Sequence, residues 1–99
     1  QRYRVKVYFT DEAEADLEAI ADYIARDNPA RAISFVHELR EKALALASLP
    51  LAFPLVPRYE RQGVRRRIYG NYGIFYTVRE QLVVVIHILH GARDCDSIL

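Results

Sequence analysis

The sequence predicts one α+β domain, residues 1–99, with an N-terminal strand, an antiparallel helical hairpin and then a three-stranded antiparallel meander. Three observations support this fold class. Tyr3 to Phe9 alternates apolar and polar side chains, the middle of the chain repeats apolar residues at three- and four-residue steps, and the chain from Val64 onward reads as short strands separated by turns. Elements in this order form a single sheet with the hairpin packed on one face.

The first helix has a clear start and a clear end. Thr10 offers a hydroxyl as N-cap, and the acidic residues that follow it favour the positive end of the helix dipole. The apolar stripe consists of Ala13, Leu17, Ile20, Ala21 and Ile24. We therefore expect the solvent side to carry Glu14, Asp16, Glu18 and Asp22. Asp27-Asn28-Pro29 marks the end of this helix.

Asn28 caps the second predicted helix, and Pro29 suits its first position, where a missing N–H costs nothing. The turn between the helices is so short that they must lie antiparallel. The second apolar stripe consists of Ala32, Val36, Leu39, Ala43 and Leu46, widened by Ile33 and Phe35. Prolines 50, 54 and 57 end the helix and define an extended loop to about Gln62. The apolar loop residues expected to lie on the core are Leu51, Phe53, Leu55 and Val56.

Two tight turns divide the C-terminal part into three strands. Gly70-Asn71 suits a type II′ hairpin turn, which needs a positive φ at its first position, and a second turn falls near Arg79-Glu80-Gln81. The run from Leu82 to Leu89 is apolar on both faces, so we expect this strand to be central. It is too short to cross a membrane.

Charge divides along the chain. Residues 1–9 carry three basic and no acidic groups, residues 10–49 four basic and nine acidic groups, and residues 58–99 seven basic and four acidic groups. The helical part is thus acidic and the strands basic. Either these are solvated surfaces that happen to differ, or a basic sheet face meets an acidic or phosphate-bearing partner.

Few residues are candidates for chemistry. Strand alternation places Arg65 and Arg67 on one face, where an exposed pair could bind two phosphates or carboxylates, or could simply keep the sheet soluble. His87, inside an apolar strand, is expected to be a hydrogen-bonded core residue, whereas His90 stands at a strand end, where polar groups gather. The three histidines share no ligand spacing with the single cysteine, Cys95, so we expect no metal or other cofactor. No export signal is recognised, which makes a cytoplasmic location the expectation.

The sequence resembles the bacterial ParE/RelE toxins over nearly its whole length. The resemblance is most specific at Thr10 to Leu17, at Tyr72-Gly73-Ile74-Phe75-Tyr76, and at the ending Ile88 to Asp94, which is close to the ParE branch. The resemblance implies a toxin of a type II toxin–antitoxin module that poisons DNA gyrase. It also implies a small ParD-like antitoxin, whose C-terminal segment wraps the toxin and whose N-terminal domain binds operator DNA.

The RelE relatives instead cut messenger RNA in the ribosome. One of their arginines falls on Gly73 here and another on Arg93, and no tyrosine follows Arg93. Because groups that stabilise charge at phosphorus are missing, the resemblance favours a gyrase poison without catalytic residues. A ribosome-dependent endoribonuclease, with Arg65, Arg67 and His90 as a different constellation, and an inactive antitoxin-binding module stay open as alternatives.

The resemblance also directs attention to two sets of contact residues. Those expected to touch the target are Arg65, Arg67, His90 and Arg93. Those expected to line an apolar groove for the antitoxin are Tyr23, Ile33, Phe35 and Phe53, although any of these could instead complete the core.

Overall fold

Strands and helices follow one another in the order that the sequence predicts. The computed structural model describes residues 5–91. Its elements are β1 (Lys6–Phe9), α1 (Asp11–Ala25), α2 (Pro29–Leu44), the short 3-10 helix η1 (Ala45–Ala47), β2 (Arg65–Tyr69), β3 (Tyr72–Arg79) and β4 (Leu82–His90). Strand β1 begins at Lys6, whereas the predicted start at Tyr3 lies outside the described residues.

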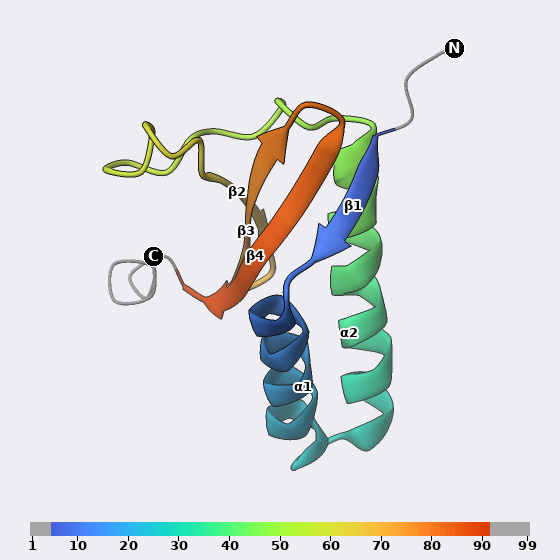
Figure 1. Ribbon diagram of the computed structural model, residues 1–99. Coiled ribbons are helices and arrows are strands. Elements are labelled where there is room, and N and C mark those ends of the chain that lie inside the picture. The colour runs from blue at the N-terminus through green and yellow to red at the C-terminus, as the bar shows by residue number, and fades with distance from the viewer. Residues whose placement is uncertain (1–4, 92–99) are drawn as a thin grey trace.

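The strands form one mixed sheet in the order β1-β4-β3-β2. Strand β4 pairs in parallel with β1 and antiparallel with β3, and β3 pairs antiparallel with β2. Both helices lie on the same side of this sheet (Figure 1). The predicted meander and the central position of the apolar strand are therefore confirmed.

Capping residues fix where the helices begin. The Thr10 hydroxyl accepts a hydrogen bond from the Ala13 N–H at 3.1 Å, as predicted, and it also donates to the Ile86 carbonyl of β4 at 3.0 Å. The Asn28 side chain accepts from the Arg31 N–H at 3.0 Å, and Pro29 occupies the first turn of α2. One threonine thus caps α1 and ties it to the sheet.

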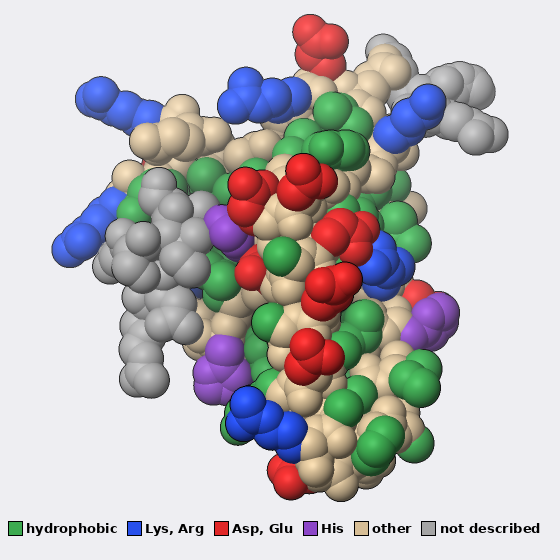
Figure 2. Space-filling model, turned by 60° about the horizontal axis from the view of Figure 1, so that its bottom comes forward, with side chains coloured by type: hydrophobic (Ala, Val, Ile, Leu, Met, Phe, Trp, Pro, Cys, Tyr) green, Lys and Arg blue, Asp and Glu red, His purple; other side chains and the backbone are tan. Residues whose placement is uncertain are grey.

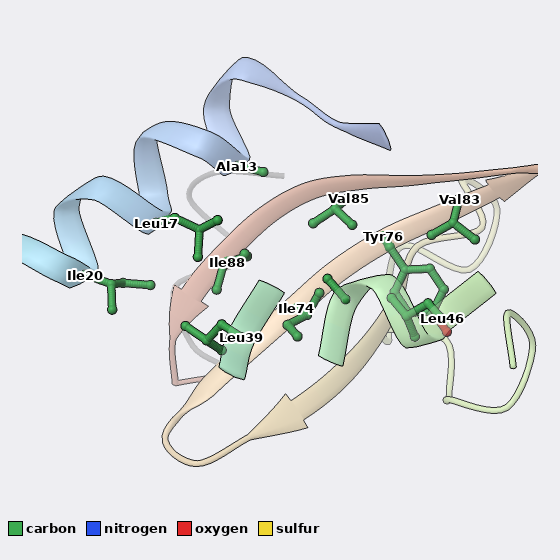
Figure 3. Packing of buried hydrophobic residues seen from close by; sticks show 11 residues of the cluster. Ala13, Leu17, Ile20, Leu39, Leu46, Ile74, Tyr76, Val83, Val85 and Ile88 are labelled. Atoms are coloured by element: carbon green, nitrogen blue, oxygen red, sulfur yellow. The ribbon is translucent and has the colours of Figure 1, made fainter. Parts of the chain in front are cut away.

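The main core lies between the helices and the sheet (Figure 3). Fully buried side chains from α1, α2, η1 and the two central strands meet there. Tyr76 is 0% exposed, and its hydroxyl donates to the Pro50 carbonyl, which satisfies this buried polar group. Burying each large apolar side chain of this kind contributes about 1.5–3 kcal/mol. The largest fully buried members are Leu17, Leu39, Leu46, Ile74, Tyr76, Val83, Val85 and Ile88.

A smaller cluster covers part of the opposite face of the sheet. Val56 from the long loop packs there with Val64, Phe75 and Leu89. Phe53 packs on the main core, so the expectation for these two loop residues is confirmed. It is wrong for Leu51, which is 66% exposed, and for Leu55, which is 37% exposed.

The end of β4 is covered by α1 and not by β1. Strand β1 stops at Phe9, the partner of Val85, while β4 continues to His90. Beyond that point the Asp16 carboxylate accepts from the Ile88 N–H at 2.9 Å and lies 2.9 Å from Nδ1 of His87. The prediction that Asp16 faces solvent is therefore wrong, whereas the expectation that His87 is hydrogen-bonded is confirmed.

Replacing the Asp16 carboxylate tests this link. Asp16→Ala leaves the Ile88 N–H and the His87 imidazole without an acceptor, so we expect a loss of about 1–3 kcal/mol in the free energy of unfolding, measured by urea denaturation. The matched control is Glu18→Ala on the exposed side of the same helix, which should change stability by less than about 0.5 kcal/mol. Equal losses in both variants would contradict the link.

Candidate functional site

A groove lies at the end of the sheet, next to the turn between β2 and β3. Both helices continue past the strands at this end of the molecule (Figure 1). It has a volume of about 410 Å³, and an adjoining hollow of about 280 Å³ shares three of its residues. We call it the ring groove because aromatic side chains dominate its lining. Its lining residues are Tyr23, Ile24, Arg31, Phe35, Gly70, Asn71, Tyr72 and His90.

The rings hold one another in fixed orientations. The centroids of Phe35 and Tyr72 lie 5.6 Å apart, and those of Tyr72 and His90 lie 5.1 Å apart in an edge-to-face arrangement. Tyr69 also stacks on Phe35, with 5.8 Å between the ring centroids. Each such pair stabilises by about 0.5–1.5 kcal/mol beyond its buried area. The groove wall is therefore built before any partner binds.

An ion pair and a hydrogen bond hold the aromatic residues of the groove in place. Arg31 forms a bidentate pair with Glu38 at 2.8 and 3.2 Å, and its guanidinium lies 5.0 Å from the centre of the Phe35 ring. The Tyr69 hydroxyl donates to the same carboxylate at 2.7 Å. The bonds from Arg31 and Tyr69 lower the pKa of Glu38, and the bond to Glu38 raises the pKa of Tyr69.

Gly70 allows the chain to turn beside the groove. Its φ is +60°, and among the described residues of this turn it alone has a positive φ, in keeping with the predicted type II′ turn. A Cβ at Gly70 would lie 3.8 Å from the Phe35 ring, which is ordinary contact. The backbone angle, and not lack of space, therefore requires glycine there.

Three of the predicted contact residues meet in the ring groove. Tyr23 is 64% exposed, Phe35 is half-buried and His90 is exposed. The groove thus joins two residues expected for the antitoxin with one expected for the target. Ile33, 76% exposed, lies outside its lining, and Arg93 lies outside the described residues.

Arg65 and Arg67 share a face of β2, as predicted, but that face is turned towards α2. Arg65 donates to the Phe53 carbonyl at 2.7 Å, and Arg67 donates to the Lys42 carbonyl at 3.2 Å, near the end of α2. The Arg67 guanidinium also lies 4.8 Å from the centre of the Phe53 ring. The expectation of an exposed arginine pair is therefore wrong, since both side chains are half-buried and hold the loop to the sheet.

Sequence reasoning missed Tyr72, Arg31 and Asn71 as parts of the site. Tyr72 directly follows the predicted turn, so its position at the sheet end could have been read from the sequence. Arg31 gave no such signal, because its pairing with Glu38 on the same helix looks like an ordinary surface contact.

Among the described residues, the lining of the groove combines aromatic surface with donors from Arg31, Asn71 and His90, and it includes no carboxylate, serine or cysteine. A general base or nucleophile needs a positioned partner, which these lining residues do not supply. Within residues 5–91, no group of three or more His, Cys, Asp or Glu side chains could hold a metal ion. No helix in that part of the chain is long and apolar enough to span a membrane.

Comparisons with known proteins give one family match and matches in fold. A family model described as the ParE toxin of the type II toxin–antitoxin system parDE matches residues 7–95. The fold is similar to a structure of the chromosomal ParDE system from P. aeruginosa, with a TM-score of 0.77 and 21% identity over 92% of this chain and 100% of that one. It is also similar to a chain of the RelBE2 toxin–antitoxin complex from Mycobacterium tuberculosis, with a TM-score of 0.67 and 24% identity over 88% and 98% of the two chains. A search of the curated proteins finds no match.

The role of Arg65 in holding the loop can be measured. Arg65→Ala deprives the Phe53 carbonyl of a charged donor, so we expect unfolding to become easier by about 1–3 kcal/mol in urea denaturation. Arg79→Ala, which removes an exposed arginine from the end of β3, should cost less than about 0.5 kcal/mol. A stability of Arg65→Ala equal to that of the unchanged protein would show that the contact is dispensable.

The hydrogen bond from Tyr69 to Glu38 leads to a prediction about the pKa of Tyr69. An ionised Tyr69 can no longer donate to the Glu38 carboxylate and is repelled by it, so Glu38→Gln should lower the pKa of Tyr69 towards its ordinary value. NMR titration of the labelled tyrosine ring carbon measures this shift. Glu18→Gln, on the exposed side of α1, is the control and should leave the pKa of Tyr69 where it is. An unchanged pKa of Tyr69 in Glu38→Gln would show that this hydrogen bond does not control the titration of the tyrosine.

Proposed function

Because the chain belongs to the ParE toxin family of type II toxin–antitoxin systems, we propose that it inhibits DNA gyrase by binding and is neutralised by a ParD-like antitoxin. The observation that carries this proposal is the lining of the ring groove. Preformed aromatic walls with a few polar donors are typical of recognition sites, and the lining residues within 5–91 supply no acid–base pair for catalysis. The toxin would act in the cytoplasm, where gyrase works.

The target contacts we propose centre on His90, with Arg93 following it in the sequence. The imidazole of His90 is exposed at the mouth of the groove, so it is available to an acidic side chain or a DNA phosphate. Arg65 and Arg67 remain proposed target contacts, but with fewer free hydrogen-bond donors than an exposed pair would have. Their guanidinium groups already bind backbone carbonyls, so they would contribute remaining donors at the edge of the sheet.

The antitoxin contacts we propose begin in the groove at Tyr23 and Phe35. An exposed tyrosine and a half-buried phenylalanine in one groove offer apolar area that a partner segment can cover. Ile33 and Phe53 lie outside the groove, so only a segment that continues around the helices would reach them. Such a segment fits an antitoxin that wraps the toxin and reaches operator DNA through its own separate domain.

The nuclease alternative has one observation in its favour. The Arg66 side chain lies over Gly73, where a Cβ would come within 3.1 Å of the arginine Cδ. An arginine from the neighbouring strand therefore lies beside the position where the RelE-type arginine is missing from the sequence. The same face, however, is occupied by the apolar cluster of Val56, Val64, Phe75 and Leu89. Arg66 therefore lies over the Phe75 ring. None of these four apolar residues can act as the general base that RNA cleavage needs.

A supercoiling assay tests the proposed function. Purified toxin in molar excess should abolish supercoiling by gyrase, and an equimolar amount of the antitoxin encoded beside it should restore the activity. His90→Ala should weaken inhibition by at least about tenfold, because the exposed contact is lost while the fold keeps its core.

Two results would count against the proposal. One is gyrase that keeps its full activity at high toxin excess. The other is new messenger RNA ends, mapped by primer extension after brief expression and lost in Arg66→Ala, which would establish the nuclease alternative in its place.

A further inference from the structure

The two edges of the sheet differ in what covers them. Along the β2 edge the long loop lies against the strand, since the Arg66 N–H donates to the Pro54 carbonyl at 3.1 Å. The opposite edge is β1, which pairs only with β4 (Figure 1). No segment within residues 5–91 pairs with the outer side of β1. An uncovered strand edge can pair with an extended segment of another chain.

The backbone groups of two residues face this open side. Lys6 and Thr10 donate their N–H groups to carbonyls in and just before β4, each at 3.0 Å. Because alternate residues of a strand turn their backbone groups to opposite sides, Val7 and Phe9 direct theirs away from the sheet. The open edge therefore offers donors and acceptors in the spacing that another strand requires.

Exposed apolar side chains lie on both sides of this edge. Val7 and Phe9 pack on the main core, so alternation turns Tyr8 to the face without helices, where it is 53% exposed. On the helical side, the Arg40 guanidinium lies 5.0 Å from the centre of the Phe9 ring, and Leu44, one turn further along α2, is 48% exposed. A partner that pairs with β1 would therefore bury apolar area on either side of the new strand pair.

Charge indicates which partner fits. Lys6 is exposed at the start of β1, and Asp11 and Glu12 are exposed directly after its end. None of these three forms an ion pair with another residue of the described chain. When two copies of one strand pair antiparallel, the start of each lies beside the end of the other. The basic start of β1 then meets the acidic start of α1 at both ends of the pair.

We propose that β1 pairs antiparallel with β1 of a second copy, which joins the two sheets across a two-fold axis. Pairing Val7 with Phe9 of the other copy uses the outward backbone groups of both, and it sets the two Tyr8 side chains directly opposite each other. In this register Lys6 lies beside Asp11 of the second copy. None of the residues that line the ring groove is in β1, so the dimer leaves both grooves open to whatever target the toxin binds.

Charge reversal combined with mixing tests this pairing. Analytical ultracentrifugation of the isolated toxin between about 1 and 500 µM should show a monomer–dimer equilibrium. Lys6→Glu and Asp11→Lys should each weaken association by at least about tenfold, because the contacts at both ends of the strand pair become like-charge pairs. An equimolar mixture of the two variants should restore the dimer, since opposite charges again face each other across the pair.

Glu18→Lys is the matched control, because it reverses an exposed acid of α1 away from the strand end. It should change the dissociation constant of the dimer by less than about twofold. Asp11 lies in the first turn of α1, where a basic residue weakens the helix. A urea denaturation curve of Asp11→Lys therefore verifies that this variant is folded, and Lys6→Glu tests the same contact from the strand.

Several results would overturn the proposal. A toxin that stays monomeric over the whole concentration range does not pair through β1. A dimer that charge reversal leaves intact, or that the mixture fails to restore, uses another surface. A monomeric toxin that binds the antitoxin more weakly as Lys6→Glu would show that the edge accepts a segment of that protein instead. Gyrase inhibition is measured separately by the supercoiling assay, so none of these results decides it.

Discussion

The structure depends on how α1 covers the part of β4 that β1 does not reach. Thr10 bonds to the Ile86 carbonyl and Asp16 bonds to the Ile88 N–H, so two short side chains replace a missing strand. Burying unpaired backbone N–H and C=O groups at a sheet edge is costly. These two side-chain hydrogen bonds satisfy such groups, so β4 can extend to His90 beside a helix. The helix is thereby fixed at the end of the sheet, and its last turns continue past the strands (Figure 1).

The ring groove follows from this overhang. Helix turns that project past a sheet expose apolar surface on their inner side, and aromatic residues from the strand ends cover only part of it. Tyr72 and His90 cover the inner side near Phe35, while Tyr23 stays 64% exposed. Ile86 is an extra residue in β4, opposite the step from Phe75 to Tyr76 in β3. This bulge shifts the register of β4, and His87 beyond it contacts Asp16 of α1.

Local signals in the sequence were enough to predict most of the fold. The caps at Thr10 and Asn28 and the turn at Gly70 depend on chemistry within a few residues, so each could be read from its neighbours. Asp16 could not, because helical periodicity places it with the solvent-facing acids and only the unequal lengths of β1 and β4 give it a buried partner. The groove has the same difficulty, since Tyr23 and Tyr72 meet only through the complete topology.

The distribution of charge shows why counting residues along a chain is a poor guide to its surfaces. Figure 2 shows acidic side chains in a row on the face that α1 presents, where the sequence has six acidic and no basic residues between Asp11 and Ala25. That half of the predicted charge separation is visible at the surface. The basic half is less available, because Arg65 and Arg67 bind carbonyls of the loop and of α2. Positive charge that satisfies the protein's own backbone contributes less to attracting a partner, so aromatic area at the strand ends is the stronger basis for recognition.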